Sequence, residues 1–158
     1  MRIGKIAAVV AAAALVGSAL APLAAHGESD KKERFAESQY RHDVMEHFSY
    51  GFKKIGAISK KKAGKTEHIA AIANIMANAA TMTKDAFEKD TRAMEGFTKS
   101  KDSIWENWDD FAMRLDKLEV DAAAFAEAAK SGDMAIIGPA MGAVGKNCKS
   151  CHDEYKEE

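Results

Sequence analysis

The chain has 158 residues, with 23 Lys or Arg against 24 Asp or Glu, and its formal net charge is −1. This length suffices for one domain with one core. Nucleic-acid binding calls for a strongly basic surface, which such a balanced composition does not provide, so we expect no nucleic-acid partner.

The first 26 residues have the layout of a secretory signal peptide. Arg2 and Lys5 form a short positive region, and residues 6–23 follow without any charge. This stretch approaches the length of a membrane span, but it is mostly alanine and leads into small residues, as a cleaved export signal does. We therefore expect cleavage near residues 24–27 and localisation in the periplasm. Cleavage removes two basic residues and no acidic one, which leaves a net charge of −3.

The remaining domain, residues 27–158, is predicted to be helical and to contain no membrane span. It is rich in Ala, Lys, Glu and Met, and it has no β-branched runs. Apolar residues spaced by three and four predict helices over about 32–60, about 67–84 and about 104–130. In the first helix, one stripe meets the spacing of a single buried face; it comprises Arg41, Met45, Phe48, Phe52, Ile55 and Ile58.

The final helix carries the chain toward its C-terminus. Pro139 lies early in it and predicts a kink or a late start near Gly138. The stretch from 86 to 101 has weaker periodicity and is predicted to form short turns and a loop. Four amphipathic helices with short links predict an all-α fold, an antiparallel four-helix bundle, which commonly holds a cofactor between its helices.

The two cysteines of the chain stand together in the segment "GKNCKSCHDEYKEE". Cys148, Cys151 and His152 form the pattern Cys-x-x-Cys-His, the attachment signature of a c-type haem. On a helix, these positions are i, i+3 and i+4, so all three side chains project from one face. Two thiols can then join the two vinyl groups of a haem while the imidazole reaches its iron.

The cysteine pair allows two other interpretations. A redox pair of the thioredoxin kind occurs near a βαβ pattern, which this chain lacks. A zinc site needs four ligands, and the remaining histidines stand at no zinc-finger spacing; they are His26, His42, His47 and His68. The motif, the export signal and the helical context together favour haem.

Three segments, taken in order, resemble the class II c-type cytochromes, the cytochrome c′ family. These are "QYRHDVMEHFSYGFKKIGAI", "IWENWDDF" and "VGKNCKSCHDEYK", which are similar to the family's first helix, to the start of its third helix and to its final helix. The resemblance implies one haem c bound covalently at Cys148 and Cys151, with His152 as the proximal axial ligand of the iron.

The first of these segments holds the other candidate site residues. The resemblance implies that Arg41 contacts a haem propionate and that His42, beside it, makes a second such contact; a plain surface position is the alternative for both. Met45 matches the family position over the distal face of the iron. Low-spin relatives use a methionine there as the sixth ligand, so we expect Met45 to be the distal axial ligand, the alternative being that it only fills the core.

These expectations describe a periplasmic mono-haem cytochrome that carries one electron at a time between redox partner proteins. It would not be an enzyme, and homodimers are known in the family. The alternative function is that of a five-coordinate cytochrome c′, which binds NO or CO. A peroxidase-like role would need polar distal groups, and the apolar surroundings of Met45 disfavour it.

Overall fold

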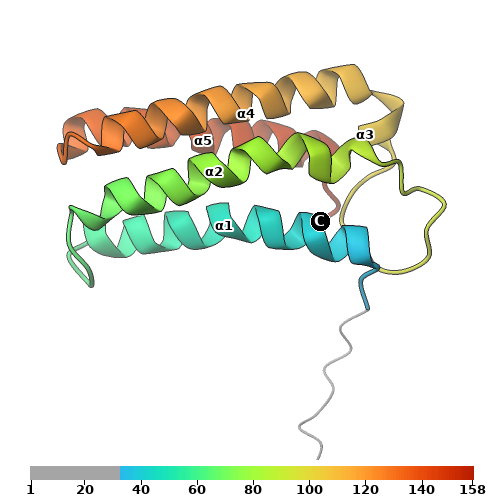
Figure 1. The fold of residues 1–158 in the computed structure, drawn as a ribbon, viewed down its shortest axis with the longest axis horizontal. Coiled ribbons are helices and arrows are strands. Elements are labelled where there is room, and N and C mark those ends of the chain that lie inside the picture. The colour runs from blue at the N-terminus through green and yellow to red at the C-terminus, as the bar shows by residue number, and fades with distance from the viewer. Residues whose placement is uncertain (1–32) are drawn as a thin grey trace, which may run out of the picture. The chain divides into compact units, whose positions relative to one another are not determined.

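The computed structural model describes residues 33–158, so the expected signal peptide, residues 1–26, lies outside the described residues. Figure 1 shows the helices of the described part, which has no β-strand beyond one isolated bridge. They are α1 (Ala36–Ser59), α2 (His68–Glu88), α3 (Ser103–Glu106), α4 (Trp108–Ala129) and α5 (Met134–Tyr155). The predicted all-α class is confirmed. Across these residues, no helix combines the length and the apolar character that crossing a bilayer requires.

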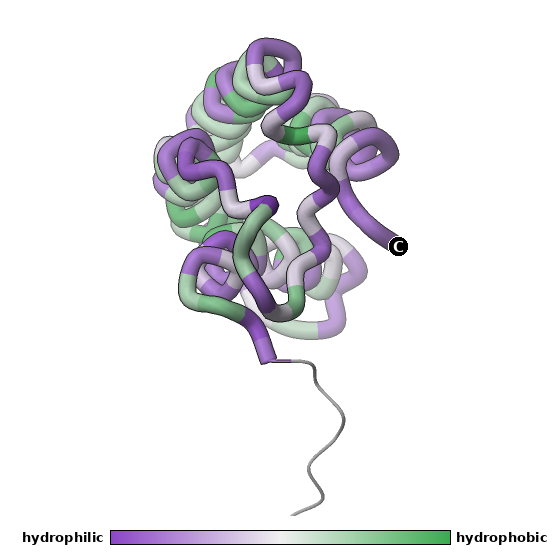
Figure 2. The backbone as a smooth tube through the Cα atoms, turned by 90° about the vertical axis from the view of Figure 1, so that its right-hand side faces the viewer, coloured by the Kyte–Doolittle hydropathy of each residue, from purple (hydrophilic) through white to green (hydrophobic). Residues whose placement is uncertain are grey.

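The four long helices form an up-and-down bundle (Figures 1 and 2). α2 packs against α1 on one side and α4 on the other, and α4 packs against α5. α1 and α5 are the exception, because no Cα atom of one lies within 8 Å of a Cα atom of the other. The backbones of α1 and α5 are therefore farther apart than those of the other three pairs of neighbouring long helices.

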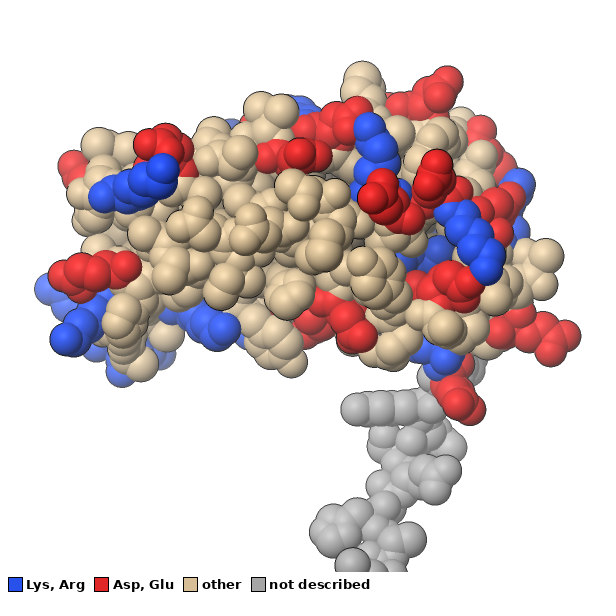
Figure 3. All heavy atoms as spheres, viewed as in Figure 1, with Lys and Arg blue, Asp and Glu red and all other residues tan. Residues whose placement is uncertain are grey.

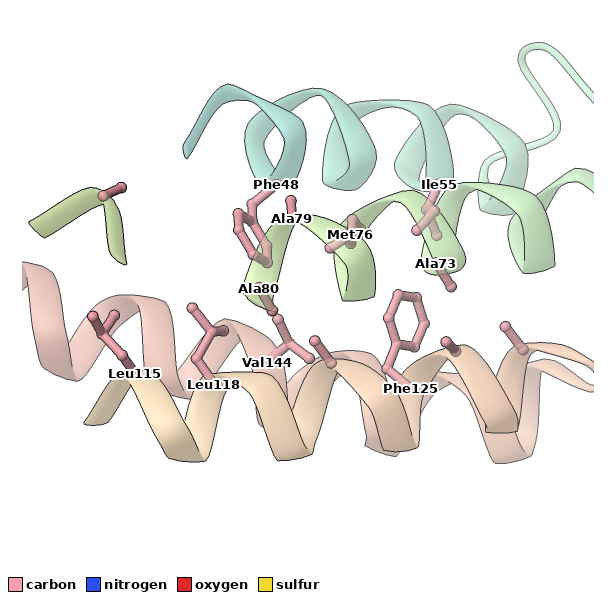
Figure 4. Close-up of a cluster of buried hydrophobic side chains, with 14 of the residues drawn as sticks. Phe48, Ile55, Ala73, Met76, Ala79, Ala80, Leu115, Leu118, Phe125 and Val144 are labelled. Carbon is pink, nitrogen blue, oxygen red and sulfur yellow. The ribbon is translucent and has the colours of Figure 1, made fainter. Parts of the chain in front are cut away.

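The core consists of the apolar stripes of all four long helices, which meet along the bundle axis (Figure 4). Ile55, Met76, Phe125 and Val144 are each 0% exposed. Phe125 projects from α4 toward Ala73 of α2 in Figure 4. Burying one such large side chain contributes about 1.5–3 kcal/mol, and this shared burial holds the helices together.

Two boundaries differ from the prediction. α2 continues to Glu88, one turn further than expected, because Ala86 and Phe87 are buried against the core. The expected third helix is interrupted at Asn107, whose φ of −123° and ψ of 45° are not helical. This break separates the short α3 from α4.

The predicted late start of the last helix is wrong. α5 begins at Met134, because the Asp133 carboxylate caps it by accepting a hydrogen bond of 2.8 Å from the backbone N–H of Ala135. Pro139 lies inside the helix. The stabilisation from the capped first turn thus outweighs the cost of the backbone hydrogen bond that Pro139 cannot donate.

Candidate functional site

A cavity of about 690 Å³ lies where α1 and α5 are separated. Its volume falls in the range of about 300–1,000 Å³ that cofactor sites occupy. Its wall is formed by residues of α1, α4 and α5, together with Phe87 of α2, Ile104 of α3 and the loop residues 98–100. All six residues singled out in the sequence line this one cavity; they are Arg41, His42, Met45, Cys148, Cys151 and His152.

The Cys-x-x-Cys-His motif forms the α5 wall of the cavity. Cys148 and Cys151 are half-buried and pack against the hydrophobic core. Burial lowers the pKa of His152, and the positive charge of Lys156 lowers it further. This favours the neutral imidazole, which is the form that ligates a metal.

The thiols differ from those of a redox-active pair. Burial raises the pKa of Cys148, and it raises the pKa of Cys151 to about 11. A reactive Cys-x-x-Cys thiol instead has a lowered pKa, because the thiolate is the nucleophile. The surroundings of these two side chains therefore suit covalent attachment to an apolar cofactor better than disulfide exchange.

Arg41 is the charged residue that is buried most deeply in the cavity wall, with 3% exposure. Its Nη2 donates a hydrogen bond of 3.0 Å to Oγ1 of Thr91. The rings of Phe35, Phe87 and Trp105 surround the guanidinium at 5.6, 5.2 and 5.4 Å from their centroids. Burial also lowers the pKa of Arg41.

Two donors of this guanidinium, Nε and Nη1 of Arg41, are buried without a hydrogen-bond partner. Buried polar groups are normally paired, and a charged donor is best paired with an anion. A carboxylate in the cavity would meet this requirement. A haem carries two carboxylates on an otherwise apolar ring, so the residues present fit this cofactor.

His42 and Met45 form the α1 wall beyond Arg41. Both side chains are half-buried, and Met45 also packs against the hydrophobic core. Because positions i and i+3 of a helix lie on the same face, the two residues line the cavity together. Met45 thus presents a thioether to the same space as the imidazole of His152.

Several residues of the wall carry no signal in the sequence. Thr98, Lys99 and Ser100 lie in the loop between α2 and α3. Backbone hydrogen bonds hold this loop against the end of α5. The backbone N–H of Lys101 donates to the Tyr155 carbonyl at 3.1 Å, and that of Glu157 donates to the Lys99 carbonyl at 2.9 Å. These are long-range backbone contacts, which periodicity does not reveal.

Arg114 and Tyr155 also belong to the wall although the sequence did not mark them as site residues. In the sequence, Asp110 and Arg114 look like an ordinary i, i+4 ion pair on a helix surface. The only available signal is that Tyr155 follows His152 by three residues and therefore shares its helix face.

The lysines of the α1–α2 connection lie far from the motif. Six lysines and no acidic residue occur in residues 53–65, and basic side chains gather at this end of the bundle in Figure 3. α5 runs away from this end, so its motif lies toward the other end (Figure 1). The lysine-rich end is thus separate from the cavity.

Comparison with known proteins agrees with this geometry. Residues 36–156 match the family model described as Cytochrome C′. Cytochrome c-554 of Cereibacter sphaeroides is 32% identical over 80% of this chain and 95% of its own length. Cytochrome c′ of Rhodospirillum rubrum is 30% identical over 91% of this chain and 97% of its own length.

A solved structure, cytochrome c prime from Shewanella frigidimarina, superposes with a TM-score of 0.69. It is 30% identical, and the match covers 77% of this chain and 94% of that one. The fold and the motif define a helical-bundle cytochrome of class II. The chain belongs to the cytochrome c′ family, and its cofactor is haem c, bound covalently.

Proposed function

We propose that the protein is a mono-haem electron carrier, with its haem held in the cavity between α1 and α5. The observation that carries this proposal is the convergence of a thioether, an imidazole, two thiols and a buried cation on one cavity of about 690 Å³. Haem c supplies a one-electron couple between ferric and ferrous iron. No bond of a substrate is made or broken in this function.

The α5 residues would hold the cofactor on its proximal side. Cys148 and Cys151 would bind it through thioether links, and His152 would be the proximal axial ligand. The half-buried thiols of Cys148 and Cys151 and the imidazole of His152, which is more exposed, lie on one helix face, and this supports these roles. The lowered pKa of His152 also supports them, because it favours the neutral imidazole. On the α1 side, the two unpartnered donors of Arg41 would pair with a propionate, and His42 would make a second contact.

Met45 would be the distal axial ligand. Its side chain lines the cavity from α1, the helix that faces the motif across this space. A thioether ligand raises the potential of a haem, which suits an electron carrier. Residues that hold both axial positions fixed would also keep the geometry nearly constant between oxidation states.

One observation favours the alternative function, the binding of NO or CO at an open distal position. Met45 is packed against the hydrophobic core, and a methionine fills irregular gaps readily. If core packing holds the thioether away from the iron, the distal position stays free for a small gas.

An absorption spectrum separates these two functions. We expect the oxidised protein to show a low-spin spectrum with a weak sulfur-to-iron charge-transfer band, and we expect Met45→Ala to abolish that band. Met82→Ala is the matched control, because Met82 is a half-buried methionine that packs against the core without lining the cavity. A high-spin wild-type protein that takes up CO readily would establish the gas-binding function instead.

We further propose that the protein works in the periplasm, with redox proteins as partners, and forms a homodimer. The N-terminal pattern of Arg2, Lys5 and the uncharged stretch after them supports export. The mass of the mature protein after export tests the cleavage near residues 24–27, and light scattering tests the dimer. A single-chain mass in solution would contradict the dimer and leave the carrier function unaffected.

A further inference from the structure

We propose that Arg114 of α4 is a positioning residue for the haem-attachment turn of α5, and that its charge, fixed by Asp110, raises the reduction potential of the haem. This inference rests on the proposed function, since it assigns the haem to Cys148, Cys151 and His152. It adds a part of the site that comes from neither α1 nor α5.

The guanidinium of Arg114 connects α4 to the attachment motif. Its Nε donates a hydrogen bond of 2.7 Å to Oδ2 of Asp110, and its Nη1 donates one of 3.0 Å to the backbone carbonyl of Ser150. Ser150 is one of the two residues enclosed by Cys148 and Cys151. A rigid fork that spans a carboxylate and this carbonyl fixes the turn that carries both attachment points.

A buried tyrosine completes the arrangement. Tyr155 is 4% exposed, and its hydroxyl donates a hydrogen bond of 2.5 Å to the same Oδ2 of Asp110. The guanidinium carbon of Arg114 lies 5.4 Å from the centroid of the Tyr155 ring. Asp110 is therefore held from two directions, and it holds Arg114 in turn.

The two charges of this pair do not face the cavity equally. Arg114 lines the cavity, whereas Asp110 does not, and their side chains are 31% and 41% exposed. A positive charge in the wall disfavours the oxidised haem, which is the more positive of the two states. The net effect of the pair is a higher reduction potential.

The experiment measures the reduction potential of the haem protein by voltammetry in four forms: wild type, Arg114→Gln, Asp110→Asn and Lys117→Gln. Lys117 is the matched control, because it lies on the same helix and pairs with Asp121 at i, i+4 over 2.8 Å but does not line the cavity. Arg114→Gln and Lys117→Gln remove one positive charge each.

We expect Arg114→Gln to lower the potential and Asp110→Asn to raise it. At a fixed potential, the ratio of oxidised to reduced protein should change by about threefold to tenfold, or roughly 30–60 mV at 59 mV per tenfold. Lys117→Gln should stay at the wild-type value. If Arg114 had only a structural role, Arg114→Gln would change the free energy of unfolding and leave the reduction potential of the haem unchanged.

Equal shifts in Arg114→Gln and Lys117→Gln, or no shift in Arg114→Gln, would overturn the inference. If Arg114→Gln does not accumulate with haem, Asp110→Asn decides, and a potential at or below the wild-type value is then the overturning result. The mass of the wild-type protein is measured first. A wild type without haem at Cys148 and Cys151 refutes the proposed function itself, which separates that failure from failure of the Arg114 inference.

Discussion

The two halves of the bundle interior are built from different kinds of side chain. The filled half, toward the α1–α2 connection, is closed by the apolar residues Ile55, Ile69, Ala73, Phe125 and Ile137, each of which is 0% exposed. The cavity half, between α1 and α5, surrounds about 690 Å³ of space, and many half-buried and polar side chains line it beside buried apolar ones such as Phe111 and Leu115. One half is filled by its own side chains, and the other leaves the space in which the proposed haem would lie.

Buried polar residues mark the same division. Of the four buried polar or charged residues of the described chain, three belong to the cavity half: Ser38 and Arg41 line the cavity, and Thr91 bonds to Arg41. An unpartnered buried donor costs free energy until a ligand pairs with it. We infer that the filled half secures the fold, whereas the cavity half depends on the haem.

The largest expected effect tests the filled half. Phe125→Ala should lower the free energy of unfolding by about 3–5 kcal/mol, because it removes a fully buried aromatic side chain from between α4 and α2. Chemical denaturation measures this loss. Met113→Ala on the same helix, at a side chain that is 62% exposed, should change stability by less than about 0.5 kcal/mol.

If the filled half secures the fold by itself, the cost of Phe125→Ala should be the same with and without haem. The loss in free energy of unfolding caused by Phe125→Ala is measured twice, once in the wild-type protein and once in a Cys148→Ser/Cys151→Ser background. A cost that disappears without haem would show that the two halves do not differ as described.

The second prediction concerns a substitution in the cavity half whose effect on the free energy of unfolding should change sign when the haem is absent. With haem bound, Arg41→Met should lower the free energy of unfolding by about 3–5 kcal/mol, since it leaves a buried carboxylate unpaired. In the haem-free Cys148→Ser/Cys151→Ser background, the same change should raise it by about 1–3 kcal/mol, because it removes the unpartnered donors.

The control for this reversal is Arg92→Met, at an exposed arginine that is paired with Asp90 at 2.7 Å. Arg92→Met should leave the free energy of unfolding unchanged within error in both the haem-bound and the haem-free protein. Arg41→Met with the same sign in both forms would contradict a propionate partner for Arg41.

A third prediction concerns how the absence of haem changes amide hydrogen exchange in different parts of the chain. Cys148→Ser/Cys151→Ser should yield protein without the added haem mass, and hydrogen exchange should then speed up in the cavity half. A local loss of about 2.7 kcal/mol of stabilisation would speed exchange on the order of 100-fold, since about 1.4 kcal/mol corresponds to a factor of ten. Amides of residues 145–155 should show this change, whereas those around Phe125 should change less than about tenfold. Equal acceleration in both regions would contradict the division.

Much of the α1 and α5 contribution was predictable from the sequence, because local spacing carries it. The stripe from Arg41 to Ile58 follows from positions three and four apart, and the motif at Cys148 to His152 follows from its residue types. Each of these signals lies within one helix and needs no knowledge of its neighbours. The structure then brings all six predicted residues to one cavity.

The rest of the site depends on contacts between distant segments. Residues 98–100 enter the wall only because backbone hydrogen bonds tie their loop to the end of α5. Arg114 belongs to it because of the carbonyl of Ser150, 36 residues further along the chain. The break at Asn107 is likewise a change of backbone direction that the apolar spacing of α4 does not announce.

The smallest expected effect lies at the edge of the cavity half. Tyr155→Phe removes one hydroxyl, which donates to Asp110, and should lower the free energy of unfolding by about 1 kcal/mol at neutral pH. Burial and the hydrogen bond to Asp110 raise the pKa of Tyr155 to about 12, from an ordinary value of 10. The folded state thus favours the protonated phenol, and this contribution is present in full below pH 10 and is lost as the pH rises through 12. Phenylalanine has no such group, so the stability gap between the two proteins should narrow from pH 10 to pH 12 in denaturant titrations.

The control is Tyr50→Phe, at a tyrosine that is 53% exposed, and its free energy of unfolding should equal that of the wild type at every pH. If the stability gap between Tyr155→Phe and the wild type instead stays constant to pH 12, the Asp110 contact does not hold the phenol in its protonated form.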